Sequence, residues 1–233
     1  MPSDIALITI DLDDTLWPCA PVIDAAEAEL YAWLQLHAPG LTARHDHASL
    51  SNHRRSLMQH HPEVAHDITA VRLLSLQALL QDAGHGPSLA EQALALFREA
   101  RNRVTPFPDV LPALASLARY YTLVSVTNGN AEAARTPVGD YFRHHYTAAE
   151  VGGAKPAPAL FVAACEAAGV APAQALHVGD DPRLDVAAAR QLGMQVVWVN
   201  RYGRDWPENL LPADGVVEDL FGLEAWLRGD EAR

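Results

Sequence analysis

The sequence predicts an α/β protein, a doubly wound parallel sheet into which a domain of four helices is inserted. Apolar segments of strand length alternate with helical segments between about residues 109 and 217, and such alternation builds parallel sheets covered on both faces. One more strand-like segment opens the chain, and residues 22–103 carry helical periodicity only. We therefore expect a core domain of residues 1–17 and 104–233 and a helical domain of residues 18–103.

Acidic residues follow the first predicted strand. Residues 5–10 are apolar and rich in β-branched side chains, and Asp11, Asp13 and Asp14 follow them. Because side chains alternate along an extended chain, Asp11 and Asp13 project to the same side. Two carboxylates at one site repel each other unless a cation or a shared proton neutralises them. The pattern favours a metal or acid–base site over its alternative, a turn with solvated aspartates.

Prolines mark both crossings between the two predicted domains. Pro18 and Pro21 stand at the first crossing, and Pro106 and Pro108 stand at the second. Proline interrupts regular structure. A tether of two such segments suits a cap that hinges over a cleft.

Helical stripes predict the helices of the insert. We expect a weaker helix between residues 42 and 59 and a capping box of Ser88 and Glu91 at the start of the last helix. Apolar stripes at helical spacing define the other helices: Val22, Ala26, Leu30, Trp33 and His37; Val71, Leu74, Ala78 and Gln81; and Leu89, Ala93, Phe97 and Ala100.

The remaining strands carry polar residues at their carboxyl ends, where doubly wound sheets bind ligands. We expect strands at residues 121–127, 145–147, 175–179, 195–199 and 215–217, and helices at 109–120, 139–143, 158–168 and 183–192. Thr127 closes the second of the predicted strands, and Asp180 follows a later one. Polar groups from three chain segments should therefore meet at one edge of the sheet.

Composition narrows the classes of partner. The chain has 17 Lys and Arg against 29 Asp and Glu, a net charge of −12, which argues against nucleic acid or an anionic membrane surface as the main partner. Cys19 and Cys165 lack metal-ligand spacing, so we expect free thiols in a reducing compartment. With no leader-like start and no apolar run near the ~20 residues that span a bilayer, we expect a cytoplasmic protein.

Four motifs occur in order along the expected sheet edge: Asp11-Leu12-Asp13-Asp14-Thr15, Thr127, Lys155-Pro156, and Gly179-Asp180-Asp181 with Asp185. Each motif alone is weak, but the ordered set resembles the haloacid dehalogenase superfamily of phosphohydrolases. The helical insert resembles the first cap type of that family. Ala157 departs from an aspartate that is common after Lys-Pro in related sequences, at a position outside the reacting groups.

The residues themselves support phosphoryl transfer. The Asp11 carboxylate can attack phosphorus and form an aspartyl-phosphate, which divides one hard displacement into two easier ones. Asp13 can protonate the departing alkoxide and later take a proton from water. Because a free aspartate has a pKa of about 3.9, this role needs the pKa of Asp13 to be raised by neighbouring carboxylates or desolvation.

Oxygen ligands from Asp11, Asp180 and a backbone carbonyl suit Mg2+. The resemblance implies that this carbonyl belongs to Asp13. Three further groups are expected just outside the ligands, although the two aspartates among them equally suit a helix N-terminus: Thr15, Asp181 and Asp185.

The substrate phosphate should meet hydrogen-bond donors. Thr127, the backbone amides of Asn128 and Gly129 and the ammonium of Lys155 are candidates, with Lys155 also contacting Asp11. An Asn-Gly pair more often forms a hairpin turn, and an isolated loop lysine is usually solvated. The histidines lack the companion ligands of a zinc site, so we expect them mainly on the surface or on the cap helices: His45, His47, His60, His61, His144 and His145. Trp17 and Trp33 are expected to pack rather than to stack on a substrate, although Trp17 follows the Asp11 motif closely enough to line a cleft.

Residues 62–69, 127–130, 139–142 and 177–181 together resemble a bacterial flavin-pathway branch of the family. The resemblance implies 5-amino-6-(5-phospho-D-ribitylamino)uracil or FMN as substrate. His66 and Asp67 are then candidate cap contacts, although a helix-start aspartate beside a solvated histidine explains them equally well.

Other functions stay open from sequence. A broad-specificity sugar-phosphate phosphatase or a phosphomutase would use the same residues. A haloacid dehalogenase shares the nucleophile but needs neither Asp13 nor a metal, and a non-catalytic binding protein would need none of the motifs. The expected partner is a small-molecule phosphate ester, bound by a monomer or a homodimer.

Overall fold

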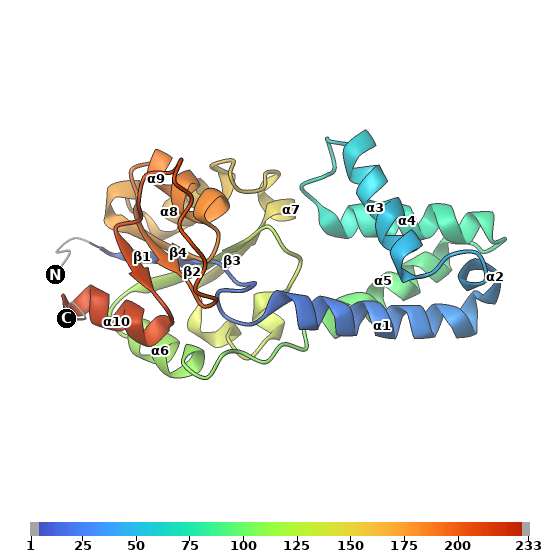
Figure 1. The fold of residues 1–233 in the computed structure, drawn as a ribbon, viewed down its shortest axis with the longest axis horizontal. Coiled ribbons are helices and arrows are strands. Elements are labelled where there is room, and N and C mark those ends of the chain that lie inside the picture. Colours follow the sequence, from blue (N-terminus) through green and yellow to red (C-terminus); the bar gives the residue numbers. More distant parts are fainter. Residues whose placement is uncertain (1–4, 230–233) are drawn as a thin grey trace. The chain divides into compact units, whose positions relative to one another are not determined.

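The computed structural model describes residues 5–229 and divides into two compact units. One unit comprises the chain up to Pro18 and from Val104 onward, and the other is Cys19–Arg103 (Figure 1). The second unit is thus inserted after the first strand of the first. Across residues 5–229, every helix is too short or too polar to cross a lipid bilayer.

The first unit contains a six-stranded parallel sheet, which confirms the predicted fold class. Its order is β3-β2-β1-β4-β5-β6. The strands are β1 (Leu7–Ile10), β2 (Thr122–Thr127), β3 (His144–Thr147), β4 (Ala175–Gly179), β5 (Gln195–Val199) and β6 (Gly215–Val217). The chain builds outward from β1 on one side and then from β4 on the other. The carboxyl ends of β1 and β4 therefore flank the switch point at which such sheets bind ligands.

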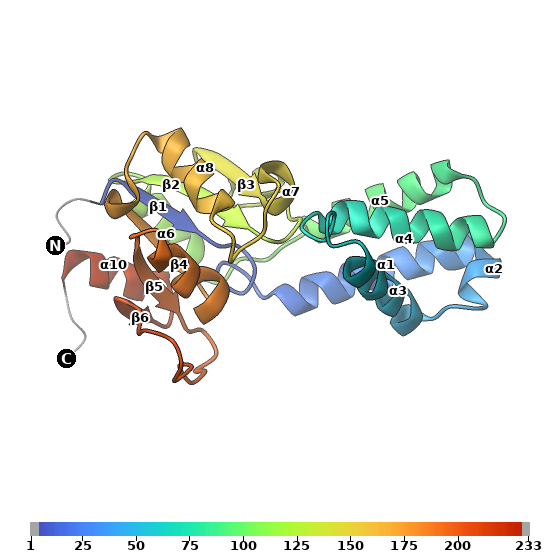
Figure 2. The same ribbon diagram turned by 90° about the horizontal axis from the view of Figure 1, so that it is seen from above.

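Helices cover both faces of this sheet, and every residue of β1 and β4 is buried. The segments α8 (Ala159–Ala168), η4 (Pro182–Ala187) and α9 (Ala188–Gln191) lie on one face, and α6 (Val110–Leu117) packs with α10 (Leu220–Arg228) on the other (Figures 1 and 2). Strands buried on both faces read as continuous apolar runs. The predicted strands at 175–179, 195–199 and 215–217 accordingly agree with β4, β5 and β6.

The connecting helices of this unit differ from the prediction in detail. The expected helix at 183–192 begins as the π-helical η4 before it continues as α9, and the helix expected near 139–143 is only the 3-10 turn η2 (Gly139–Tyr141). A Cβ on Gly139 would lie 2.8 Å from the carbonyl oxygen of Ala133, so the turn is packed closely against η1 (Ala133–Arg135). The prediction also omitted α7 (Ala148–Val151), η3 (Pro172–Gln174) and α10.

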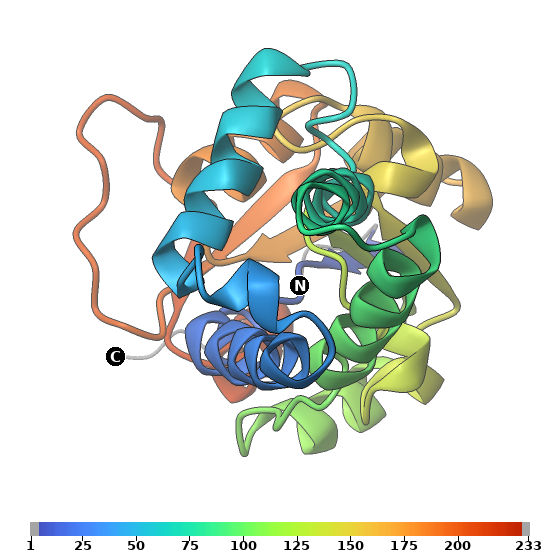
Figure 3. The ribbon, with the colours of Figure 1, turned by 90° about the vertical axis from the view of Figure 1, so that its right-hand side faces the viewer.

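The second unit is helical throughout, as predicted. Its helices are α1 (Cys19–His37), α2 (Pro39–Thr42), α3 (His47–His60), α4 (Ile68–Asp82) and α5 (Pro87–Arg101). Figure 3 shows them in blue to green, and α1 packs on α5, which packs on α4. The one-turn α2 was not among the predicted helices, and the weaker helix begins at His47 instead of near residue 42.

Two of the predicted stripes are partly wrong. In α1 the buried face continues from Leu30 to Leu34, whereas His37 is exposed. In α4, Leu74 and Ala78 are exposed, and Gln81 is too, because Arg72 and Ser75 take buried positions. These polar side chains are buried with partners: Arg72 donates to Glu27 at 2.8 Å, and Ser75 lies 2.8 Å from His53 Nδ1. Polar side chains buried against partners on other helices break the apolar pattern that a sequence shows.

The predicted capping box of the last insert helix is also wrong. Helix α5 starts two residues earlier, with Gly86 as N-cap and Pro87 in its first turn, and no side chain caps it. Proline suits the first turn because its missing N–H has no partner there in any case.

Candidate active site

Lys155 is the buried cation around which three of the four motifs meet. Its Nζ donates to Asp11 Oδ1 at 2.5 Å, to Asp185 Oδ1 at 2.6 Å and to the carbonyl oxygen of Val126 at 3.2 Å. Only 4% of the residue is exposed. An ammonium group has three donors, and these contacts match all three. The expected contact between Lys155 and Asp11 is therefore present in this structure.

Asn128 fixes the backbone at Lys155. Its side-chain amide donates to the carbonyl oxygen of Lys155 at 2.8 Å, and its Oδ1 accepts from the Lys155 N–H at 2.7 Å. Thr127, the residue before it, accepts a hydrogen bond from the Gly129 N–H at 2.8 Å. For Asn128, the sequence prediction assigned only the backbone amide, as a donor to the phosphate. It missed the Asn128 side chain, because no local signal joins residues so far apart in sequence.

Three carboxylates meet at the switch point of the sheet. One oxygen each from Asp11, Asp180 and Asp185 lies within 4.8 Å of the others. Asp11 follows β1, and Asp180 follows β4. Asp180 is held by two side chains that sequence reasoning missed: Trp198 donates to its carbonyl oxygen at 2.7 Å, and Arg204 donates to Oδ2 at 2.8 Å.

Burial and the neighbouring charges shift the pKa values of this cluster in opposite directions. Burial and the charge of Asp185 raise the pKa of Asp180 to about 6, although Arg204 opposes the shift. Burial also raises the pKa of Asp11 against the pull of Lys155, while repulsion from Asp185 adds to the rise. The pKa of Asp185 is lowered, because Lys155 and His177 outweigh the effect of burial. Likewise the aspartates outweigh burial at Lys155, so its pKa is raised.

The carboxylates at this edge fit a hard divalent cation. Asp11 and Asp180 offer carboxylate oxygens, the donors that Mg2+ prefers, and burial together with repulsion between neighbouring carboxylates raises the pKa of both. The third carboxylate of the cluster is Asp185, which the sequence prediction had placed outside the ligands. In residues 5–229, no histidine belongs to a comparable group.

A compact turn follows Asp11 and orients Asp13. Trp17 is fully buried, which agrees with its predicted packing role, and its Nε1 donates to Asp13 Oδ1 at 2.9 Å. Asp14 has a positive φ of 58°, a conformation that aspartate tolerates better than most residues. Tyr202 donates to Asp14 Oδ1 at 2.9 Å. The hydroxyl of Thr15 lies 3.4 Å from Asp11 Oδ2, a long contact.

Asp181 and Asp185 have different structural roles, although Asp181 is the N-cap of η4 and Asp185 lies within it. Asp181 caps the helix, since its Oδ1 accepts from the backbone N–H of Arg183 at 2.7 Å and of Leu184 at 2.8 Å. Asp185 turns back toward β4, and a Cβ on Gly179 would lie only 2.3 Å from its Cγ. Glycine at 179 is therefore required for the Asp185 carboxylate to reach Lys155. In the second unit, Asp67 caps α4 through the N–H groups of Thr69 and Ala70, as its helix-start alternative predicts.

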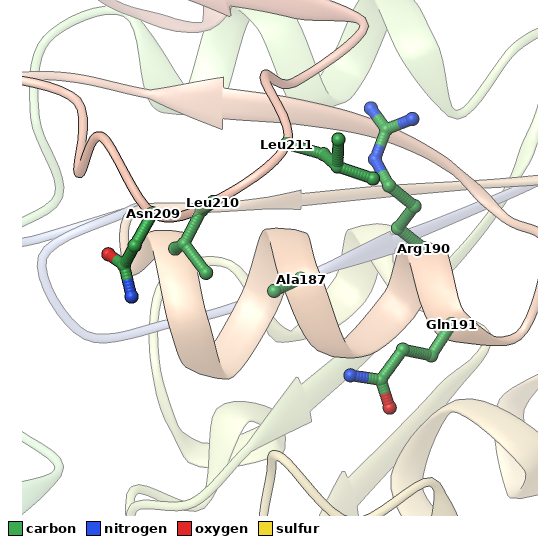
Figure 4. A pocket seen from close by; sticks show the side chains of 6 residues that line it. All are labelled: Ala187, Arg190, Gln191, Asn209, Leu210 and Leu211. Carbon is green, nitrogen blue, oxygen red and sulfur yellow. The ribbon is translucent and has the colours of Figure 1, made fainter.

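The cavity in Figure 4 lies away from this site. It has a volume of about 380 Å3 and lies between the η4–α9 segment and residues 209–211. Its one charged side chain, Arg190, donates to Asp214 Oδ1 at 3.0 Å and to the carbonyl oxygen of Pro212 at 2.7 Å. None of the predicted site residues lines it.

Comparisons with known proteins agree with this geometry. A sequence model described as a haloacid dehalogenase-like hydrolase matches residues 5–193. The 5-amino-6-(5-phospho-D-ribitylamino)uracil phosphatase YigB of Escherichia coli (strain K12) is 33% identical over 216 residues, which cover 89% of this chain and 90% of that protein.

Solved structures share the whole fold. The crystal structure of 2-haloacid dehalogenase from Pseudomonas syringae pv. Tomato DC3000 has a TM-score of 0.91 and 39% identity, over 97% of this chain and 100% of that one. The HAD phosphatase from Thermococcus onnurineus has a TM-score of 0.69 and 25% identity, over 97% and 99% of the two chains.

Proposed function

The chain belongs to the haloacid dehalogenase-like hydrolase family, and on that basis we propose that it hydrolyses small phosphate monoesters through an aspartyl-phosphate. One observation carries the proposal. The buried carboxylate of Asp11 lies against Lys155 beside Asp180, with Asp13 two residues further along. A carboxylate nucleophile that meets a dianionic ester needs such neutralising charge and fixed position.

In the first step, an oxygen of Asp11 attacks phosphorus while the bond to the ester oxygen breaks. Asp11 Oδ1 is engaged by Lys155, so Oδ2, with its long contact to Thr15, is the oxygen we assign to the attack. Asp13, in its carboxylic acid form, gives its proton to the departing alkoxide. The hydrogen bond from Trp17 fixes the orientation of the Asp13 carboxyl group for this transfer.

In the second step, Asp13 acts as a base. Its carboxylate takes a proton from a water molecule, which attacks the phosphorus of the aspartyl-phosphate. The bond between phosphorus and Asp11 breaks, and phosphate and the free Asp11 carboxylate are formed. We assign phosphate binding to Thr127, the amides of Asn128 and Gly129, and the charge of Lys155.

Mg2+ is the cofactor we assign to the cluster. Asp11, Asp180 and the backbone carbonyl of Asp13 would hold it, with Thr15, Asp181 and Asp185 nearby. Bound there, the ion supplies charge that screens Asp11 from an anionic ester and orients the phosphoryl group.

For the substrate we propose the phosphate ester on which the YigB relative is named to act, 5-amino-6-(5-phospho-D-ribitylamino)uracil, or FMN. The support is the match along nearly the whole chain. A sugar phosphate, or mutase rather than hydrolase chemistry, would use the same core residues, so product analysis must separate them. We further propose that the protein works in the cytoplasm as a monomer or homodimer.

A second candidate function is dehalogenation of a 2-haloacid, which the name of the 39% identical protein from Pseudomonas syringae suggests. In that reaction Asp11 would displace halide from carbon, and water would then hydrolyse the ester. A halide leaving group does not need to be protonated. The held orientation of Asp13, the proposed acid, therefore favours the phosphatase.

A paired release assay decides between these functions. Purified protein is given a panel of small phosphate esters, with the riboflavin precursor and FMN included, and a panel of 2-haloacids. Phosphate and halide are measured with Mg2+ and with chelator. We expect phosphate release that chelator abolishes. Halide release without phosphate release would replace the first function by the second, and release unaffected by chelator would remove the metal from the proposal.

A further inference from the structure

His177 is a buried polar residue to which the proposed reaction assigns no role. It lies in the middle of β4 and is 0% exposed. Its Nε2 is 3.1 Å from Asp185 Oδ1, and its Nδ1 is 2.9 Å from Thr9 Oγ1 on the neighbouring β1. The Phe161 and His177 rings pack in a T-shaped arrangement, with ring centroids 4.8 Å apart and planes at 76°.

The contacts of the ring define its tautomer. A carboxylate oxygen only accepts, so Nε2 carries the proton that faces Asp185. Burial lowers the pKa of His177, which favours the neutral ring. Nδ1 is then an acceptor, and the single proton of the Thr9 hydroxyl is directed to it at 2.9 Å in preference to the carbonyl oxygen of Leu176 at 3.3 Å. The result is a directed chain from Thr9 through His177 to Asp185.

Asp185 is fixed by this chain and by the backbone. Its Oδ1 accepts from both His177 and Lys155, and its Oδ2 accepts from the Asp181 N–H at 2.9 Å. With both oxygens engaged, the carboxylate has one orientation, in which Oδ1 lies 2.6 Å from Lys155 Nζ.

We propose that His177 is a positioning residue, which holds Asp185 so that Lys155 is kept against Asp11. Groups that orient the ligands of metal sites are commonly worth about 10–100-fold in activity or affinity when they are removed, and we expect an effect of the same order at this edge. For its effect on turnover, the inference rests on the proposed phosphatase function.

The test is a double-mutant cycle with the purified full-length chain. His177→Leu removes the donor and keeps an apolar side chain in the core. His177→Gln keeps an N–H2 donor near the position of Nε2. Each is made alone and with Asp185→Asn, and kcat and KM are measured for the best phosphate ester. His145→Leu is the matched control, because His145 pairs with Ser125 at 3.0 Å on the same sheet and touches neither Asp185 nor Lys155.

We expect His177→Leu to lower kcat about 10–100-fold with KM changed less than about twofold. His177→Gln should restore much of the loss, and His145→Leu should leave kcat within about twofold. In the Asp185→Asn background, His177→Leu should have little further effect, because coupled residues are not additive. Equal losses in both backgrounds, or an unchanged kcat, would overturn the proposal.

Two further measurements keep the test decisive. If His177→Leu does not fold, Thr9→Val replaces it in the cycle, since it removes the other end of the chain. If the wild-type chain releases no phosphate, the proposed function fails, and the same cycle is measured by urea unfolding. Non-additive shifts of the midpoints then support the positioning of Asp185 by His177, and additive shifts refute it.

Discussion

At the scale of single residues, Lys155 Nζ and Asp11 Oδ1 are in contact, and neither charged group could be buried at low cost without the other. An unpaired charge in the interior costs several kcal/mol, and here each charge satisfies the other at 2.5 Å. The pair therefore places a carboxylate in a poorly solvated position, where it can react, without an uncompensated charge.

The first prediction concerns Asp11 itself. Asp11→Asn should lower kcat by about 10^4-fold or more, because removal of a nucleophile has effects of this order. Asparagine has the shape of aspartate, and Lys155 keeps its contact with Asp185, so the fold should persist. Steady-state phosphate release measures the loss, and circular dichroism checks the fold. Activity near that of the wild type would remove Asp11 as the nucleophile.

The second prediction concerns Trp17 and the proposed acid. Trp17→Phe keeps a ring in the core but removes the hydrogen bond to Asp13. Loss of this hydrogen bond should cost about 1.4 kcal/mol of transition-state stabilisation, which corresponds to about a tenfold fall in kcat. The fall should be large for alkyl phosphates and small for p-nitrophenyl phosphate, whose leaving group needs little protonation.

Trp226→Phe is the control for this prediction. Trp226 lies in α10, where it packs against Gly215 in β6, so its substitution should leave kcat within about twofold. Equal losses for both kinds of leaving group in Trp17→Phe would count against Asp13 as the acid.

At the scale of elements, residues 200–204 after β5 link three parts of the site edge. Arg201 donates to the carbonyl oxygen of Thr15 at 2.7 Å and forms two hydrogen bonds with Asp109, at 3.0 and 2.9 Å. Tyr202 contacts Asp14, and Arg204 contacts Asp180. The loop therefore holds the turn after β1 and the end of β4 in place.

The third prediction tests the anchor of this loop. Both side chains of the Arg201–Asp109 pair are less than a tenth exposed, and loss of one partner from a buried pair costs about 3–5 kcal/mol. Asp109→Asn should lower the free energy of unfolding by about 3 kcal/mol at pH 7. Asp214→Asn is the matched control. Asp214 also binds one arginine and one backbone N–H, but it is 36% exposed, so about 1 kcal/mol or less is expected.

The pH dependence of this effect has a definite sign. Burial acts to raise the pKa of Asp109, but hydrogen bonds from Arg201 and the Leu220 N–H outweigh it, so the pKa is lowered on folding. A lowered pKa contributes stability above the unfolded value of about 3.9, and this contribution is lost as pH falls toward the folded value. Urea unfolding should therefore show the difference between wild type and Asp109→Asn undiminished from pH 7 to 5 and shrinking below about pH 4.

At the scale of the whole molecule, the net charge of −12 makes the local balance at the switch point decisive. Three clustered aspartates face one lysine and one arginine in a chain that is already acidic. Long-range charge therefore opposes an anionic substrate, and attraction has to come from Lys155 and a bound cation.

The fourth prediction follows from this balance. A cation that binds only the folded chain stabilises it by about 2.7 kcal/mol at 100 times its Kd, which for a chain of this size raises Tm by roughly 5–10 °C. Mg2+ should produce this shift in the wild type and not in Asp180→Asn. KCl at equal ionic strength is the control, because screening alone would act on both proteins. An equal Mg2+ shift in Asp180→Asn would exclude Asp180 as a ligand.

The sequence by itself determined the sheet and the edge at which the motifs collect. Buried parallel strands read as continuous apolar runs, and polar residues that follow them must lie at the carboxyl edge. Asp11, Thr127 and Asp180 could be placed in this way because Thr127 ends a strand and each aspartate stands directly after one. By contrast, the helical periodicity of apolar residues predicted the wrong buried face for α4 in the insert, because Arg72 and Ser75 are buried with partners on other helices.

Only the tertiary structure decided which side chains hold the site residues in place. Asn128 binds the Lys155 backbone from 27 residues away, and Arg201 reaches Thr15 across 186 positions. Hydrogen bonds between such distant positions leave no periodic trace in a sequence, because their partners are chosen by the packing of the sheet. The identity of the reacting residues can therefore be read locally, at the ends of single strands. Their orientation depends on contacts that form only when those strands lie side by side.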